Sequence, residues 1–250
     1  LTQIWDESFE GDIYSNIMFK GDDIAGQIEK FRNTLVRNAE EFQIERITIH
    51  GIANENGIFE IPEIYYSENT PLNTDVRKVE YTWWHQLISK TNSNLILNDS
   101  WSGSTICYTG YDNYDCSKTS SFIFRLRQLI ANGFFETNKI NTIFLFGASN
   151  DSGANSPLGE LKFDNFEEAD LYYALPAICY IIKLLKETLP DANIYFPIND
   201  DIKPEIKEGI VSACDHIGVK AIVLKNITKV ESHPTIKGME EIVEQLLEVV

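Results

Sequence analysis

The chain has 250 residues, of which 43% are hydrophobic, and it carries a formal net charge of -17. It contains no apolar run near the ~18 residues of a membrane-spanning helix. The acidity opposes binding to nucleic acid, because affinity for phosphate backbones comes from clustered lysine and arginine. We therefore expect a globular protein with no membrane span and no nucleic-acid partner.

The chain alternates short apolar strands with longer helical patterns. Residues 1–20 show no clear period, and we expect them to form an N-terminal arm or an edge strand. Helical spacing of apolar residues predicts helices at Asp22–Phe42, Val79–Lys90, Ser121–Ala131, Asn165–Thr188, Lys203–His216 and Thr235–Val249. Short β-branched and aromatic runs predict strands at Arg46–His50, Asn94–Asn98, Thr142–Gly147, Asn193–Ile198 and Lys220–Leu224.

This alternation is typical of βαβ units, and brief apolar strands are typical of a sheet that helices cover on both faces. We predict one α/β domain over residues 1–250: a three-layer α/β/α, flavodoxin-like fold with a five-stranded parallel sheet. Trp83 and Trp84 are neighbours on a predicted helix and point in different directions, so we expect at most one to be fully buried.

The cysteines and histidines give few further constraints. Among the four cysteines only Cys107 and Cys116 are close enough in sequence to suggest a disulfide, and free thiols are the alternative that we favour. His85 and His216 have no partner at ligand spacing, so we expect no metal and no cofactor. The chain begins at Leu1, which fits a secreted or periplasmic protein that has lost its leader, or a trimmed chain.

Ligands of open parallel sheets bind where loops leave the carboxyl ends of the strands. The loops after the second, third and fifth predicted strands contain "NDSWSGSTICYTGY", "FGASNDSGANSPLGE" and "TKVESHPTIKGMEEI". In this order they resemble the SGNH or GDSL-like acylhydrolase family, over roughly Ile47 to Ile242. The resemblance implies that Gly103 and Asn150 donate hydrogen bonds to an oxyanion and that His233 acts as the base.

The sequence departs from the family pattern at the reacting groups. An ungapped alignment of "ITIHGIANENG" places Ile52 where the family has Asp and Ala53 where it has the nucleophilic Ser. Val230 stands three residues before His233, where the family has Asp, and Ala148 replaces a glycine before Asn150. Alanine cannot attack a carbonyl carbon, and loss of a triad nucleophile costs several orders of magnitude in rate.

Three serines in these loops, Ser102, Ser104 and Ser149, are candidates for a replacement nucleophile, although loop hydrogen bonding also explains each of them. Trp101, Ser102 and Tyr108 are candidate substrate contacts, because an aromatic, hydroxyl-rich loop suits a carbohydrate or an acylated glycan.

We therefore expect an esterase or acylhydrolase for an acylated substrate, a carbohydrate ester among the options, with impaired or lost catalysis. The alternative is a non-catalytic relative that binds a glycan or acyl ligand. A nucleotide-binding module on the same architecture is disfavoured, because no phosphate-binding glycine motif follows a strand.

Overall fold

The fold is built on a parallel β-sheet. The computed structural model describes residues 46–50 (backbone only), 75–76, 78–101, 103–230 and 232–250. The strands are β1 (Arg46–His50), β2 (Asn94–Asn98), β3 (Thr142–Leu145), β4 (Asn193–Ile198) and β5 (Lys220–Val223), in the order β2-β1-β3-β4-β5. Each neighbouring pair is parallel. The predicted α/β fold with a parallel sheet is confirmed.

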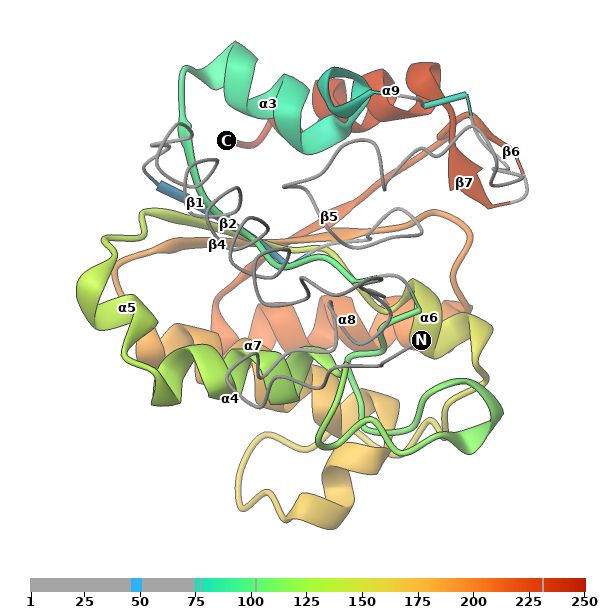
Figure 1. The fold of residues 1–250 in the computed structure, drawn as a ribbon. Coiled ribbons are helices and arrows are strands. Elements are labelled where there is room, and N and C mark those ends of the chain that lie inside the picture. The colour runs from blue at the N-terminus through green and yellow to red at the C-terminus, as the bar shows by residue number, and fades with distance from the viewer. Residues whose placement is uncertain (1–45, 51–74, 77, 102, 231) are drawn as a thin grey trace, which may run out of the picture.

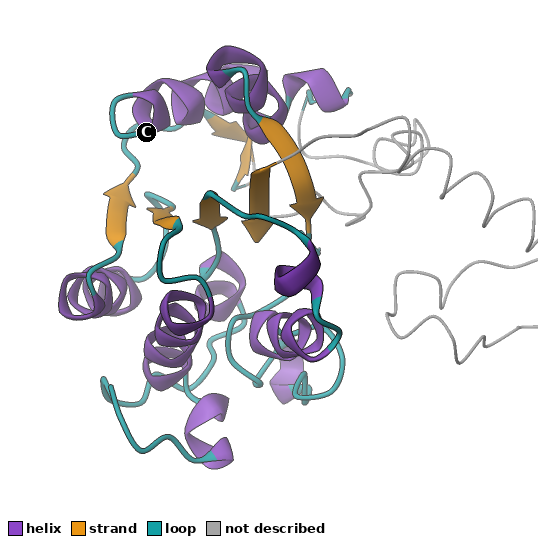
Figure 2. Ribbon diagram, turned by 90° about the vertical axis from the view of Figure 1, so that its left-hand side faces the viewer, coloured by secondary structure: helices purple, strands orange, loops and turns teal. Residues whose placement is uncertain are grey.

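Helices cover both faces of this sheet (Figure 1). One layer contains α3 (Trp83–Thr91) and α9 (Ile236–Leu247), and the other contains α4 (Phe122–Ala131), α5 (Phe134–Thr137), α7 (Ala174–Thr188) and α8 (Pro204–Ile217). The view along the sheet in Figure 2 shows the same separation of helices above and below the strands. The arm predicted at residues 1–20 and the helix predicted at Asp22–Phe42 lie outside the described residues.

Two predicted helices are divided in the structure. The expected helix at Val79–Lys90 consists of a short 3-10 helix, Val79–Tyr81, followed by α3. The expected helix at Asn165–Thr188 consists of the 3-10 helix Glu168–Tyr172 followed by α7. In both cases a residue with extended backbone, Thr82 or Tyr173, separates the two parts. The spacing of apolar residues therefore continues across a point where the helix is interrupted.

Local sequence explains where several helices begin and end. The Ser121 hydroxyl accepts a hydrogen bond from the Phe124 N–H at 3.2 Å and caps α4, and the Thr235 hydroxyl accepts one from the Gly238 N–H at 3.1 Å and caps α9. Pro204 is the first residue of α8, and Gly218, with φ of 80°, ends it in the left-handed conformation.

Alternate residues of β3 belong to two different hydrophobic cores. Ile143 and Leu145 pack in the core beneath α4, α7 and α8, whereas Phe144 packs with Trp83 in the core beneath α3 and α9. Successive side chains of a strand point to opposite faces, so a continuous apolar run is the signature of a strand buried on both sides. The apolar sequence of β3 therefore determines its central place.

The expectation that only one of Trp83 and Trp84 is buried is wrong. Trp83 is 3% exposed and meets Phe144 and Phe146 edge to face, at 5.8 and 5.4 Å between ring centroids. Trp84 is 6% exposed and belongs to the same core. Because α3 packs against both the sheet and α9, two adjacent sides of the helix are covered. The contact between α3 and α9 joins segments that are far apart in sequence, so the spacing of residues within α3 does not reveal it.

At Gly238, α9 packs closely against the segment that follows β5. A Cβ at this position would lie 2.1 Å from the Thr228 carbonyl oxygen. We expect Gly238→Ala to lower the free energy of unfolding by about 2 kcal/mol, because backbone must move to admit the methyl group. Urea denaturation monitored by circular dichroism measures the change.

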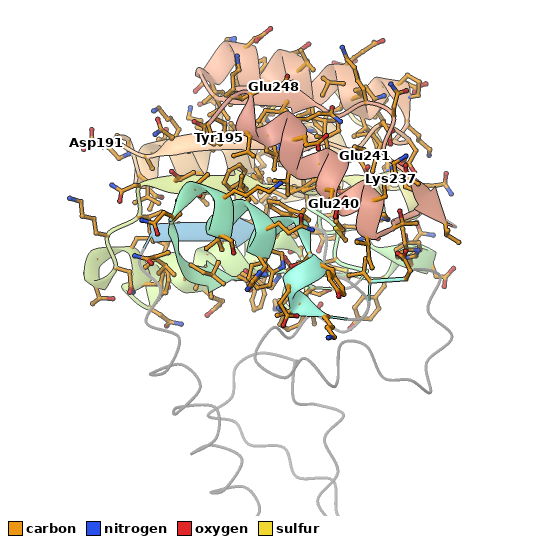
Figure 3. All side chains as sticks on the ribbon, turned by 90° about the horizontal axis from the view of Figure 1, so that it is seen from above. Asp191, Tyr195, Lys237, Glu240, Glu241 and Glu248 are labelled. Carbon is orange, nitrogen blue, oxygen red and sulfur yellow. The ribbon has the colours of Figure 1, made fainter. Side chains whose placement is uncertain are left out.

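Lys237→Ala is the matched control for this prediction. The Lys237 side chain is 73% exposed and lies on the outer side of α9 beside Glu241, 3.5 Å away (Figure 3). We expect this variant to stay within about 0.5 kcal/mol of the parent. Equal stability of Gly238→Ala and Lys237→Ala would contradict the packing argument.

Candidate active site

The loops that carry the predicted site residues leave the carboxyl ends of the strands. The short helix α6 (Ser149–Gly153) follows β3, and a hairpin of β6 (Lys229–Val230) and β7 (His233–Pro234) follows β5. Both lie at the same end of the sheet (Figure 1). Neither α6 nor the hairpin has an apolar period, and neither was predicted as an element.

Gly103 lies in the loop after β2. Its φ is 70°, a left-handed conformation that glycine adopts without strain, and a Cβ there would meet nothing within 4 Å. The glycine is therefore required by backbone conformation and not by space. The Gly103 N–H has no acceptor among the described residues, so this group is free to donate to a ligand.

Asn150 stands in α6 with its side-chain amide bonded at both ends. Its Nδ2 donates to the Ser104 carbonyl oxygen at 2.9 Å, and its Oδ1 accepts from the Tyr111 hydroxyl at 3.1 Å. Ser104 is the residue after Gly103, so the Asn150 amide lies beside Gly103. The two predicted oxyanion donors, which are far apart in sequence, are thus brought together.

Asp151 joins α6 to the loop after β2 through buried hydrogen bonds. Its carboxylate is fully buried, with 0% exposure, and accepts the backbone N–H groups of Ile106 and Cys107 at 2.9 and 3.0 Å. Burial raises the pKa of Asp151, and the backbone N–H bonds offset only part of that rise. These bonds hold the loop after β2 against α6.

Arg125 of α4 holds the other side of the loop after β2. Its guanidinium forms an ion pair with Asp99 at 2.6 Å and donates to the Ser104 hydroxyl at 3.1 Å. The same group lies 5.4 Å from the centre of the Trp101 ring. Because Arg125 is 6% exposed, a single buried cation anchors residues on both sides of Gly103.

Ala148 precedes α6 with φ of 70°, a conformation that costs an L-residue about 1–2 kcal/mol. This is the position where the resemblance implies glycine. The adjacent Gly147 is constrained by space instead, because a Cβ there would come within 2.7 Å of the Phe122 ring. The turn into α6 therefore keeps the glycine-type conformation although the glycine is gone.

His233 lies in β7, half-buried, directly opposite Val230 across the hairpin. Ser232, with φ of 68°, forms the turn between them. The three-residue offset of the family's Asp and His is therefore a cross-strand pair here. Val230 is 48% exposed and cannot accept a hydrogen bond from the imidazole, so the acid position carries no acid.

Lys229 connects the His233 hairpin to the loop after β4. Its ammonium contacts Asp200 at 2.5 Å and Asp201 at 2.8 Å, and it donates to Asn199 Oδ1 at 2.7 Å. Asn199 is 3% exposed, and its Nδ2 donates to the Ser149 hydroxyl at 3.2 Å. A chain of polar contacts thus joins the hairpin to the residue beside Asn150.

The predicted site did not include the loop after β4, "NDDIK", which contributes Asn199 and Asp200 to these contacts. This loop leaves the carboxyl end of a strand like the others, and the Asn-Asp pair there was the available signal. Tyr111 was also missed as a partner of Asn150, since nothing local in its sequence indicates that contact.

The remaining predicted site residues differ in their burial and in their contacts. Trp101 is half-buried beside Arg125. Tyr108 is 2% exposed, and its hydroxyl accepts from Arg127 at 2.8 Å, so neighbouring residues of the chain cover the side chain that was predicted as a substrate contact. The Ser104 hydroxyl donates to the Ser120 carbonyl oxygen at 2.5 Å, which explains this serine structurally. Ile52, Ala53 and Ser102 lie outside the described residues.

The four cysteines are free and buried, so Cys107 and Cys116 form no disulfide. Among the described residues no group of three or more His, Cys, Asp or Glu side chains is arranged to hold a metal ion. In the same part of the chain, no helix has the length and apolarity needed to cross a membrane.

A family model described as GDSL-like Lipase/Acylhydrolase matches residues 58–250. A structure described as a GDSL-like lipase from Bacteroides ovatus is 36% identical, covers 82% of this chain and 97% of its own, and has a TM-score of 0.71. One with the same description from Bacteroides uniformis is 34% identical, covers 84% and 97%, and has a TM-score of 0.73. A comparison with curated proteins finds no match.

Carbohydrate esterases share the fold at lower identity. A family two carbohydrate esterase from Clostridium thermocellum, in complex with cellohexaose, is 12% identical with a TM-score of 0.54, and covers 82% of this chain and 63% of its own. The range of the family match begins after Ala53.

The contact network predicts a specific role for Lys229 in stability. Replacing it in Lys229→Met leaves the Asp200 and Asp201 carboxylates together without their cation, and we expect the free energy of unfolding at neutral pH to fall by about 2 kcal/mol. Lys203→Met, which removes an exposed lysine bonded to Asn155, is the control and should change stability by about 0.5 kcal/mol or less.

The deficit of Lys229→Met should depend on pH. Burial acts to raise the pKa of Asp200, but the Lys229 hydrogen bond, the Ile227 N–H and the Lys229 charge outweigh it and lower that pKa. A lowered folded-state pKa stabilises the protein above the ordinary carboxyl range, and this stabilisation is lost as the pH falls through the lowered value. Urea titrations should therefore show parent and variant converging below about pH 4. A deficit that does not change with pH would contradict the ion-pair account.

Proposed function

Because the chain belongs to the GDSL-like lipase/acylhydrolase family, we propose that it is an ester-directed hydrolase of the SGNH type with impaired or lost turnover. Its site keeps the groups that stabilise an oxyanion and has Ala53 at the nucleophile position. We also assign residues 1–250 to a single domain of the five-stranded, flavodoxin-like SGNH arrangement. The strand order β2-β1-β3-β4-β5 supports this assignment.

The observation that carries the proposal is the bond from Asn150 Nδ2 to the Ser104 carbonyl oxygen, 2.9 Å long. It positions a side-chain amide next to the unengaged Gly103 N–H. Ester cleavage develops negative charge on the carbonyl oxygen, and two fixed donors stabilise that charge more than they stabilise the neutral ester. This is the chemistry that remains when the nucleophile is removed.

The proton-transfer part of the mechanism lacks its nucleophile. In an intact triad, the base takes the proton of the serine hydroxyl, and an acid orients the base. Here Ala53 offers no hydroxyl, and Val230 stands where the family has its acid. We propose that His233 occupies the base position and that any hydrolysis proceeds by attack of water, far more slowly than with a serine nucleophile.

For the substrate we propose an ester of a small acyl group, and a carbohydrate as the alcohol part. The half-buried Trp101 ring beside Gly103 and the neighbouring Ser102 are the proposed contacts, since an aromatic face and hydroxyl donors suit a sugar. Carbohydrate esterases among the proteins of the same fold, including an acetyl xylan esterase from Butyrivibrio proteoclasticus, support this choice.

Restoring the two reacting residues tests the proposal. In the double variant Ala53→Ser with Ile52→Asp, we expect hydrolysis of p-nitrophenyl acetate to rise at least ~100-fold over the parent, because the oxyanion donors are already in place. Adding His233→Ala should remove the gain. A correctly folded double variant with the parent's activity would overturn the assignment of Ala53 to the nucleophile position.

The second candidate function is binding of a glycan or acyl ligand without turnover. It is favoured by one specific observation: the sequence departs from the family pattern at two separate positions, Ala53 and Val230, whereas Gly103 and Asn150 match that pattern. Calorimetry with acetylated xylo-oligosaccharides should then show binding by the parent chain, weakened about 10-fold in Asn150→Ala through loss of one donor. Measurable turnover by the parent that depends on His233 would exclude this candidate.

A further inference from the structure

Tyr111 is carried by a rigid hairpin that the proposed reaction does not use. The hairpin spans 109–115: Thr109 and Asp115 form a β-bridge, and the Gly110 N–H donates to the Tyr114 carbonyl oxygen at 2.8 Å. A Cβ on Gly110 would come within 2.7 Å of the Cys116 sulfur. The hairpin is therefore closed tightly, and its backbone holds Tyr111 in one place.

The Tyr111 side chain reaches from this hairpin to α6. Its hydroxyl donates to Asn150 Oδ1 at 3.1 Å, and a Cβ on Gly153 would lie 2.7 Å from the same hydroxyl oxygen. The absence of a side chain at Gly153 is thus what lets the phenol approach α6. Burial and the nearby Asp151 carboxylate raise the pKa of Tyr111, so its hydroxyl keeps the proton that it donates.

The two bonds of the Asn150 amide determine its orientation. Nδ2 donates to the Ser104 carbonyl oxygen at 2.9 Å, and a reversed amide would place two oxygen atoms against each other there. Tyr111 holds the opposite end, so rotation about the last side-chain bond is restricted from both sides. Nδ2 has two hydrogens and Ser104 accepts one of them, which leaves one N–H for another acceptor.

We propose that Tyr111 is a positioning residue that fixes the Asn150 amide and thereby keeps its second N–H directed at the carbonyl oxygen of the ester. This inference rests on the proposed role of Asn150 as an oxyanion donor. Without the Tyr111 hydroxyl, the amide is held at one end only, and the donor loses part of the pre-organisation on which oxyanion stabilisation depends.

Two variants disturb this contact from opposite sides. Tyr111→Phe removes the hydroxyl and keeps the ring, and Gly153→Ala leaves both partners chemically intact but displaces the hydroxyl. Tyr114→Phe is the matched control: this tyrosine lies on the same hairpin, is 60% exposed, and its hydroxyl bonds no described residue. Each is made in the parent chain and in the Ala53→Ser, Ile52→Asp background.

In the restored background we expect both Tyr111→Phe and Gly153→Ala to lower kcat on p-nitrophenyl acetate about 10-fold with KM changed less than about 2-fold, a fraction of the cost of deleting an oxyanion donor. Tyr114→Phe should leave both constants unchanged. In the ¹⁵N-labelled parent, the side-chain amide signals of Asn150, assigned by their loss in Asn150→Ala, should shift in the first two variants and stay in place in the third.

The outcomes separate this inference from the proposed function. If Asn150→Ala lowers kcat about 100-fold while Tyr111→Phe and Gly153→Ala have no effect, the positioning role is overturned and the proposed function stands. If Asn150→Ala has no effect on the activity of the restored variant, the proposed function itself fails. If the restored variant is inactive, the amide signals decide: unchanged Asn150 signals in Tyr111→Phe overturn the positioning role.

Discussion

A fully buried carboxylate determines how the candidate site is assembled. The oxygens of Asp151 accept the Ile106 N–H at 2.9 and 3.1 Å and the Cys107 N–H at 3.0 Å. Such a charge is costly to bury unless backbone donors surround it. The arrangement therefore exists only when α6 and the loop after β2 are in register. Asn150 directly precedes this carboxylate, and Ser104 lies just before its donors, so the meeting of Asn150 with Gly103 depends on it.

The base position is attached by a separate polar network. Lys229 joins the His233 hairpin to Asn199 and Asp200, and the Thr228 N–H donates to Glu241 of α9 at 2.6 Å. None of these contacts is made by the side chain of Val230, one of the positions where the sequence departs from its family. These contacts hold the hairpin that carries His233 against the loop after β4 and against α9. In the function we propose, the geometry of the site and the capacity to turn over an ester are therefore separate properties.

The features that could be predicted from the sequence are those that depend on the local pattern of residues. The apolar run of β3, the helical spacing of α4 and α9 and the order of the three motif loops all rest on neighbouring residues. The motif loops indicated Gly103 and Asn150, and the bond from Asn150 to Ser104 places these two residues side by side. The strained turn at Ala148, with φ of 70°, shows a left-handed position that no longer has its glycine. The position within the motif indicated this turn, whereas an alanine by itself does not indicate a left-handed conformation.

What could not be predicted depends on contacts between distant segments. Trp84 packs in the core that α3 shares with α9, Tyr108 packs in the core beneath α4 and α7, and Lys229 meets Asp200 across 29 residues of sequence.

The most direct test of the account is a crystal structure of the Ala53→Ser, Ile52→Asp variant after reaction with a p-nitrophenyl phosphonate ester. The account predicts phosphorus bonded to residue 53 and a phosphoryl oxygen within about 3 Å of both the Gly103 nitrogen and Asn150 Nδ2. A phosphoryl oxygen that faces solvent, or that meets neither donor, would contradict it.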